Sequence, residues 1–182
     1  MAKLFLQVMG HLDMSDTTAT SDLIRTWIGQ TFPDVEPLAT EVLQTWMEVK
    51  PGELIILDTR SAAEFDVSHL PGAIRVDPDR KDLSELLQQH LSPEGNDAAG
   101  RVPREEIVCY CTVGYRSSSV ARALSAGRPS GARRVYNVDG GLVKWASESR
   151  RMEDSQGRAT QFIHPGNAVW ARAVRPELRA WM

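Results

Sequence analysis

The sequence of residues 105–117 is EEIVCYCTVGYRS, and it combines three local patterns in direct succession. Ile107 and Val108 are apolar and β-branched, which is typical of a buried strand. Cys111 then opens a short loop that contains Gly114, and the residues after this loop are apolar at helical spacing. The stretch therefore predicts a strand, a tight loop and a helix N-terminus that meet at Cys111.

This arrangement favours a reactive thiolate at Cys111. A loop curled at the start of a helix points backbone N–H groups inward, and the helix macrodipole adds about half a positive charge there. Such a site stabilises an anion, and we expect Arg116 to add a permanent positive charge at its rim. Cys109 lies inside the strand run and fits the usual role of a cysteine as a small buried hydrophobic residue.

Composition limits the classes of protein to be considered. A chain of 182 residues can bury a core of its own, and 42% apolar with 25% charged residues is typical of a globular protein. No apolar run has membrane-spanning length, and a net charge of −3 does not suggest nucleic acid as a partner. Two cysteines one residue apart cannot form a disulfide framework, which favours a reducing compartment. The cytoplasm is the default expectation, with organelle import left open.

The segments around this stretch predict strands that alternate with helices. Residues 1–20 are weakly patterned and are expected to be partly disordered, and Pro33 and Pro37 are expected to bracket a turn. Apolar stripes at helical spacing follow candidate caps at Ser21 and Thr40. Further elements are expected in this order: a strand over 53–58, a helix from Ser61 to Phe65, a strand at Ala73–Val76, a helix over 81–91, an exposed loop over 92–104, a strand over 134–138 and a helix over 140–149.

Alternating strands and helices indicate βα units and a mostly parallel sheet. In open sheets of this kind, ligands bind beyond the carboxyl ends of the strands. Asp58 and Cys111 both follow predicted strands directly, so we expect both to lie at this edge of the sheet.

Four segments, in order, resemble the rhodanese-like sulfurtransferase family in its single-domain form. LDTRSAAEF at 57–65 is similar to the family's Asp-x-Arg-x-x-x-Glu-Phe strand end, and SHLPGAI at 68–74 to its His-x-Pro-Gly-Ala turn. CTVGYRS at 111–117 looks like its Cys-x-x-Gly-x-Arg-Ser loop, and VYNVDGGLVKW at 135–145 resembles its Gly-Gly-x-x-x-Trp segment. Each segment alone is a weak signal, whereas the four together at compatible spacing are a strong one.

The resemblance implies an α/β fold, a three-layer sandwich whose parallel five-stranded sheet has helices on both faces. It covers residues 38–149, which leaves an N-terminal extension over 1–37, partly helical, and a C-terminal extension over 150–182. The last extension is too apolar for a free tail, since it includes Trp170 and Trp181. Our hypothesis is that it packs on the domain near the cysteine loop and narrows access for substrates.

The resemblance also implies a sulfurtransferase that acts through a persulfide on Cys111. A small anionic donor such as thiosulfate would supply sulfane sulfur, and cyanide or a thiol-bearing small molecule or protein would accept it. It implies no general base, metal, organic cofactor, nucleic acid or membrane. The residues implied to bind substrate are those of the loop: Thr112, Val113, Gly114, Tyr115, Arg116 and Ser117.

Residues around the loop are assigned supporting roles. Asp58 and Arg60 are expected to form a hydrogen-bonded support, and His69 to make an orienting hydrogen bond rather than to bind zinc. Glu64 could close its helix against a neighbouring backbone or an ion pair. Tyr115, at the tip of the loop, is the best candidate for substrate specificity, because an exposed aromatic ring can shape access to the sulfur.

Gly140 and Gly141 are interpreted as positions of close packing or positive φ before the final helix, and Trp145 as a core residue.

Two other functions stay open at this point. A cysteine phosphatase or arsenate reductase also uses a thiolate at a helix N-terminus, but its cradle places five residues between Cys and Arg. Here only four, from Thr112 to Tyr115, separate Cys111 and Arg116, which suits a single sulfur atom better. The second alternative is a binding or regulatory module that keeps the fold without turnover.

Overall fold

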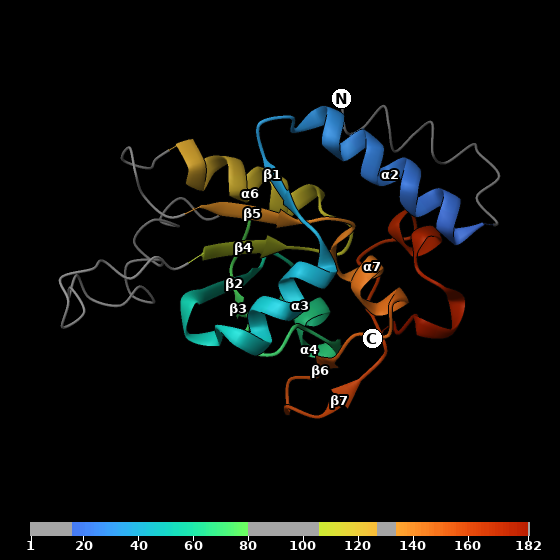
Figure 1. The fold of residues 1–182 in the computed structure, drawn as a ribbon. Coiled ribbons are helices and arrows are strands. Elements are labelled where there is room, and N and C mark those ends of the chain that lie inside the picture. Colours follow the sequence, from blue (N-terminus) through green and yellow to red (C-terminus); the bar gives the residue numbers. More distant parts are fainter. Residues whose placement is uncertain (1–15, 80–105, 127–133, 182) are drawn as a thin grey trace.

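A five-stranded parallel sheet forms the centre of the molecule in a computed structural model that describes residues 16–79, 106–126 and 134–181 (Figure 1). Every neighbouring pair of strands is parallel, in the order β1-β5-β4-β2-β3, which confirms the expected sheet. The strands are β1 (Glu36–Leu38), β2 (Leu54–Asp58), β3 (Ile74–Arg75), β4 (Glu106–Tyr110) and β5 (Val135–Val138).

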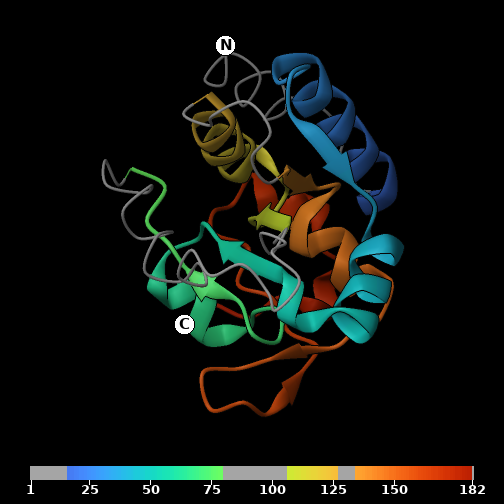
Figure 2. The ribbon, with the colours of Figure 1, turned by 60° about the vertical axis from the view of Figure 1, so that its left-hand side comes forward.

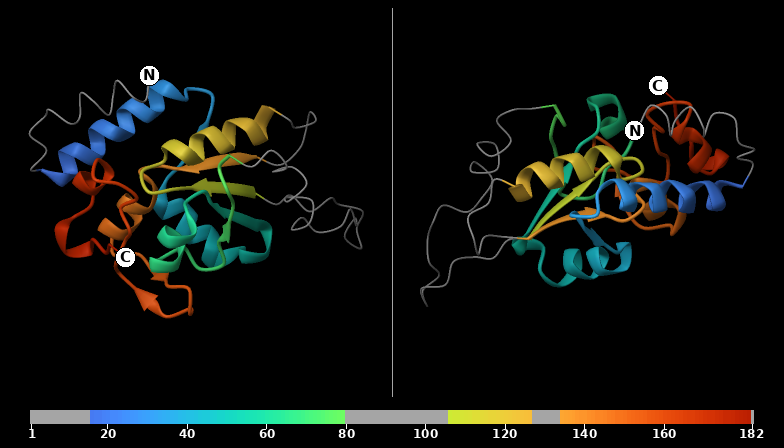
Figure 3. Two further views of the ribbon diagram at one scale, coloured as in Figure 1. Left: turned by 180° about the vertical axis from the view of Figure 1, so that it is seen from behind. Right: turned by 90° about the horizontal axis from the view of Figure 1, so that it is seen from above.

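Helices cover both faces of this sheet, as expected (Figures 1 and 3). Helix α6 packs on one face, and α3 and α7 pack on the other. The α-helices of the described residues are α2 (Thr17–Thr31), α3 (Thr40–Val49), α4 (Ala62–Val67), α6 (Tyr115–Ala126) and α7 (Gly141–Ser147). Among the described residues, no helix combines the length and the apolar character needed to cross a bilayer.

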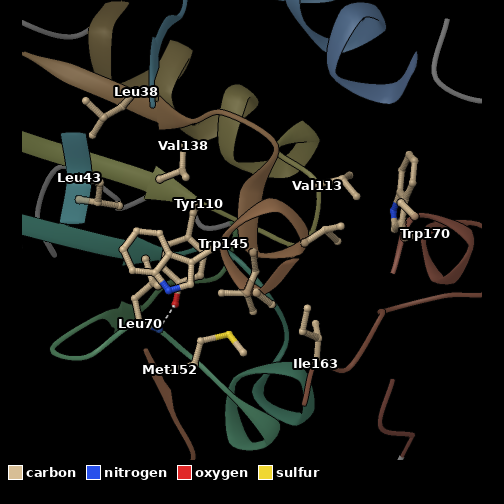
Figure 4. Close-up of a cluster of buried hydrophobic side chains, with 14 of the residues drawn as sticks. Leu38, Leu43, Leu70, Tyr110, Val113, Val138, Trp145, Met152, Ile163 and Trp170 are labelled. Carbon is tan, nitrogen blue, oxygen red and sulfur yellow. Dashed lines mark hydrogen bonds between the residues drawn. The ribbon is translucent and has the colours of Figure 1, made fainter. Parts of the chain in front are cut away.

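Strand β4 is buried on both faces, which explains its continuous apolar sequence. Ile107 and Cys109 join the hydrophobic cluster under α6, and burial raises the pKa of the Cys109 thiol. Val108 and Tyr110 point to the opposite face, where the Tyr110 hydroxyl accepts a hydrogen bond of 3.0 Å from the Leu70 N–H (Figure 4). Cys109 is therefore a structural cysteine, whereas Cys111 lies just past the end of the strand.

The starts of two helices differ from the sequence prediction. Helix α2 begins at Thr17 rather than after Ser21, because Asp16 caps it by accepting hydrogen bonds from Thr18 N and Ala19 N. Helix α3 begins at Thr40 itself, and its cap Ala39 makes no side-chain bond.

The Thr40 hydroxyl is committed to a tertiary contact, since it donates to Glu148 Oε2 at 2.6 Å.

A turn follows Pro33 as expected, and Pro37 itself lies in the short strand β1. β1 is an edge strand paired with β5, and an edge strand can lack an N–H on its outer side, so it tolerates proline. Ser61 caps α4 as predicted, with a complete capping box to Glu64. The helix expected over 81–91 and the loop over 92–104 lie outside the described residues.

The C-terminal segment contributes side chains to the main hydrophobic cluster. It contains the hairpin β6–β7 (Met152–Glu153 and Ala159–Thr160) and the 3₁₀ turns η2 (Trp170–Ala173) and η3 (Pro176–Leu178). Figure 2 shows the hairpin at the opposite end of the molecule from α6. Figure 4 shows Met152 beside Trp145, which is buried as predicted. The buried residues of the segment include Met152, Ile163, Trp170, Val174 and Leu178.

A buried ion pair fixes the chain after β2. The side chains of Asp58 and Arg60 are both 0% exposed, and Arg60 donates from Nε to Oδ1 at 2.9 Å and from Nη2 to Oδ2 at 2.7 Å. Arg60 also donates to the Ser68 carbonyl. The pair thus joins the end of β2 to the turn after α4.

We expect Asp58→Asn to lower the free energy of unfolding by about 3–5 kcal/mol, because it leaves the Arg60 charge buried without a counter-ion. Urea denaturation followed by circular dichroism measures this loss. The matched control is Asp34→Asn, which removes an exposed ion pair with Arg122 and should leave the urea midpoint nearly unchanged. Equal losses in the two variants would contradict this interpretation.

Candidate functional site

Helix α7 fixes the conformation of the cysteine loop. Leu142 N donates to the Cys111 carbonyl at 2.9 Å, and Val143 N donates to the Thr112 carbonyl at 3.0 Å. Because the C=O and N–H of a trans peptide point in opposite directions, the amides that follow these carbonyls face away from α7. Gly114 N–H donates to the Cys111 sulfur at 3.2 Å.

Two glycines make this close approach possible. One is Gly141, from the Gly-Gly pair for which close packing or positive φ was predicted, and the other is Gly114 in the loop. Gly141 has φ +59°, and a Cβ there would lie 2.5 Å from the Cys111 carbonyl oxygen and 2.8 Å from that of Thr112. Gly114 itself has φ +104°, which L side chains rarely adopt. The loop and the start of α7 are therefore in direct backbone contact.

Glu64 connects α4 to the cysteine loop. It accepts hydrogen bonds from Arg116 Nη1 at 2.9 Å and Nη2 at 2.6 Å, and from Thr112 Oγ1 at 2.9 Å. Ser61 N and Oγ, in the cap of α4, donate to the same carboxylate. Burial alone would raise the pKa of Glu64, but the bonds and charge of Arg116, with those of Ser61, lower it from 4.5 to about 2.

The charge of Arg116 is compensated rather than free. Burial opposes its charge, but the hydrogen bond to Glu64 and electrostatic interactions with Cys111 and Glu64 raise the pKa of Arg116 above its ordinary value. The side chain is 32% exposed, and its ion pair with Glu64 links the loop to α4.

Comparison with known proteins identifies the family. A sequence profile of the rhodanese-like domain matches residues 40–148. This chain belongs to the rhodanese-like family. The match includes β2, the cysteine loop and α7, and it leaves α2 and the C-terminal segment outside.

Curated relatives of the rhodanese-like chain differ in their activities. A thiosulfate sulfurtransferase of Azotobacter vinelandii is 30% identical over 127 residues, which cover 63% of this chain and 44% of the relative. A tRNA uridine(34) hydroxylase of Photorhabdus laumondii is 28% identical over 116 residues, which cover 61% of this chain and 28% of the relative. The chain thus spans less than half the length of these relatives, and family membership alone does not fix its substrate.

A solved structure shows the same fold. The thiosulfate sulfurtransferase of Pseudomonas aeruginosa superposes with a TM-score of 0.53 at 22% identity, over 85% of this chain and 27% of that one. At this level of identity the similarity establishes the rhodanese-like fold alone.

Tyr115 is not the exposed tip that the sequence suggested. Its ring stacks on Trp27 of α2, with centroids 5.0 Å apart and planes 4° apart, and it meets the edge of Phe32 at 5.3 Å. Tyr115 therefore joins the first turn of α6 to the N-terminal helix. Its two aromatic partners lie outside the rhodanese-like match.

The remaining loop side chains have different surroundings. Thr112 is buried against Glu64, and Val113 points into the main hydrophobic cluster (Figure 4). Ser117 is buried in the first turn of α6, and its hydroxyl has no hydrogen-bond partner within the described part of the chain. Cys111 is 1% exposed, so its sulfur lies beneath the surface.

His69 is held by groups outside the cysteine loop. Its Nδ1 lies 3.0 Å from the Phe65 carbonyl oxygen, its ring stacks on Phe65, and its Nε2 lies 3.7 Å from Glu153 Oε1. Across the described ranges, no group of three or more His, Cys, Asp and Glu side chains is placed to hold a metal ion.

Glu64 makes both of the contacts that the sequence analysis offered for it, a backbone contact in the cap of α4 and an ion pair. What the sequence did not reveal is that the partner in the ion pair is Arg116, 52 residues later in the cysteine loop. A glutamate that is buried requires a positively charged partner, and this requirement was the available signal that Glu64 pairs with a distant arginine.

We expect Gly141→Ala to destabilise the protein strongly, because its Cβ would overlap the backbone carbonyls of Cys111 and Thr112. The matched control is Gly72→Ala, which has φ +74° and open space around its Cβ. The control should lose only about 1–2 kcal/mol for its left-handed backbone. Urea denaturation of both variants compares the losses, and a loss at Gly141 no larger than at Gly72 would contradict the close approach.

We also expect Glu64→Gln to cost on the order of 3 kcal/mol of stability at pH 7. Because the pKa of Glu64 is lowered on folding, its charged form stabilises the protein above about pH 4.5, and this contribution is lost as the pH falls toward 2. The difference in unfolding free energy between wild type and variant should therefore shrink over that interval.

Thermal or urea unfolding across this pH range measures the difference. Glu48→Gln, an exposed position on α3, is the control and should show little difference at any pH. A constant difference for Glu64→Gln from pH 7 to pH 2 would rule out the proposed linkage.

Proposed function

We propose that this protein transfers sulfane sulfur through a persulfide on Cys111. The single observation that supports this most directly is the hydrogen bond from Gly114 N–H to the Cys111 sulfur, in a loop held by the start of α7. A thiolate and a persulfide are both anions, and preorganised N–H groups stabilise anions without reorganisation. Sulfurtransferase-named relatives agree with this chemistry.

The first half-reaction charges the enzyme. The Cys111 thiolate attacks the outer sulfur of a small anionic donor such as thiosulfate, and a new S–S bond forms at Cys111. The S–S bond of thiosulfate breaks, and sulfite leaves with the bonding electron pair. No external oxidant is consumed, because the transferred sulfur atom exchanges one S–S bond for another.

The second half-reaction discharges the persulfide. Cyanide or the thiolate of an acceptor, on a small molecule or a protein, attacks the outer sulfur of the persulfide. The S–S bond to Cys111 breaks, the product is thiocyanate or an acceptor persulfide, and Cys111 regains its thiolate. A dedicated general base is unnecessary when both nucleophiles enter as anions.

The loop residues have distinct roles in this cycle. Gly114 N–H, together with neighbouring amides of the loop, would stabilise the negative charge of the thiolate and of the persulfide. Arg116 interacts electrostatically with Cys111 and would support the anion, while its pairing with Glu64 holds the guanidinium in one orientation. Asp58 and Arg60 support the loop from below through the end of β2.

Intact-protein mass spectrometry after incubation with thiosulfate tests the proposal. We expect wild type to gain the mass of one sulfur atom, and Cys111→Ser to gain none. The matched control Cys109→Ser removes the buried cysteine of β4, in the cluster under α6, and should still gain one sulfur. If wild type gains no sulfur from thiosulfate or glutathione persulfide, a binding module without turnover is favoured instead.

A further inference from the structure

We propose that residues 163–170, here called the strap, form one wall of the Cys111 pocket and limit the proposed reaction to small donors and acceptors. This inference rests on the proposed sulfur transfer, and it names the class of substrate that the site admits. The strap lies outside the rhodanese-like match, so it is an addition to the domain rather than part of it.

Both ends of the strap are fixed to the body. At one end, Ile163 is fully buried, donates to the Leu178 carbonyl at 2.7 Å and accepts from Ala180 N at 2.9 Å. At the other end, Trp170 belongs to the main hydrophobic cluster, on the side of Val113 (Figure 4). The segment between these anchors is therefore a short bridge with little freedom to drift.

The middle of the strap touches the site itself. A Cβ on Gly166 would lie 2.8 Å from Glu64 Oε1 and 3.7 Å from Thr112 Oγ1, so the Gly166 backbone packs directly on these two groups. Glu64 Oε1 is the same oxygen that binds Arg116 and Thr112. Glycine is required here by the contact and by its φ of +79°.

The middle of the strap is more exposed to solvent than the groups on which it packs. Glu64, Thr112 and Cys111 are buried, whereas residues 166–168 of the strap are exposed. Figures 1 and 3 show the C-terminal segment lying past the arrowheads of β4 and β5, at the edge of the sheet where the cysteine loop begins. The strap is thus the outermost layer on this side of the site.

The strap limits the size of the substrates that can reach Cys111. Thiosulfate and cyanide are small, whereas a glutathione-sized thiol must displace part of this wall to bring its sulfur to Cys111. The strap would then select against bulky substrates, because their binding must supply the free energy that displaces the strap. Small substrates bind without this cost.

Gly166→Ala tests the strap by displacing it. The Glu64 carboxylate is held by Arg116, Thr112 and Ser61, so the exposed strap is expected to move outward while Glu64 stays in place. The matched control is Gly157→Ala in the β6–β7 turn, with φ +72° and open space around its Cβ. The two substitutions share the backbone cost and differ in the contact with the site.

Alkylation of Cys111 reports the result independently of turnover. We expect Cys111 in Gly166→Ala to react about tenfold faster with a bulky maleimide. If the wild-type site is open in only about 0.1–10% of molecules, a larger open fraction can raise the labelling rate by this factor. The gain with iodoacetamide, a small reagent, should be smaller, and Gly157→Ala should match wild type with both. Cys111→Ser supplies the background.

A second variant tests the same inference in case Gly166→Ala does not fold. Asn167 is exposed, and its Oδ1 accepts from Val169 N at 3.0 Å and Trp170 N at 2.9 Å, so Asn167→Ala loosens the strap without a clash. It should also increase labelling by the bulky maleimide. If both variants, folded by circular dichroism, label at the wild-type rate, the strap is not a wall of the pocket and the inference is wrong.

Activity then separates this inference from the proposed function. In Gly166→Ala, the ratio of kcat/KM for glutathione persulfide to that for thiosulfate should rise relative to Gly157→Ala. An unchanged ratio would overturn size selection while leaving sulfur transfer intact. Absence of any Cys111 persulfide in every variant would instead overturn the proposed function, and the labelling rates would still decide whether the strap covers the thiol.

Discussion

The buried carboxylate of Glu64 is the constraint on which the arrangement of the site depends. A negative charge in the interior is tolerated only with a full set of donors, and here they come from the cap of α4 and from the cysteine loop. The position of α4 and the position of the loop are therefore coupled through one side chain. Arg116, in turn, is oriented by Glu64 before any substrate arrives.

Several contacts beyond the rhodanese-like match reinforce the same edge of the sheet. From α2, Trp27 stacks on Tyr115 and Arg25 forms an ion pair with Asp139, just before the Gly-Gly pair. From the other extension, Gly166 packs on Glu64. The segments before and after the matched domain thus converge on the loop and on the turn that holds it, which gives them a role in shaping the site.

Much of the fold could be predicted because local chemistry and tertiary structure agree. The apolar run of β4, the Ser61 cap and the glycines before α7 each imply the structure that forms. The errors lie where tertiary contacts decide. No strand was predicted at Pro37, because β1 forms by pairing with β5, and Thr40 was predicted as a cap although its hydroxyl donates to Glu148.

The candidate site was predictable in position but not in its partners. Cys111 at the end of a strand, followed by a glycine loop and a helix, is a local pattern that a sequence displays directly. The pairing of Arg116 with Glu64, and the stacking of Tyr115 on Trp27, join residues far apart in the chain. Charge and aromaticity make such residues available for pairing, but only the folded topology determines which of them meet.

The end of β4 at Tyr110, between the two cysteines, has a consequence for the fate of the sulfur. Cys109 is directed into the apolar layer beneath α6, while Cys111 lies past the end of the strand, and the chain contains no other cysteine. In the proposed cycle Cys109, buried in that layer, is not placed to take over a sulfur atom from Cys111. Release of the sulfur would then require an incoming acceptor, and the lifetime of the loaded state would depend on the acceptors around the protein.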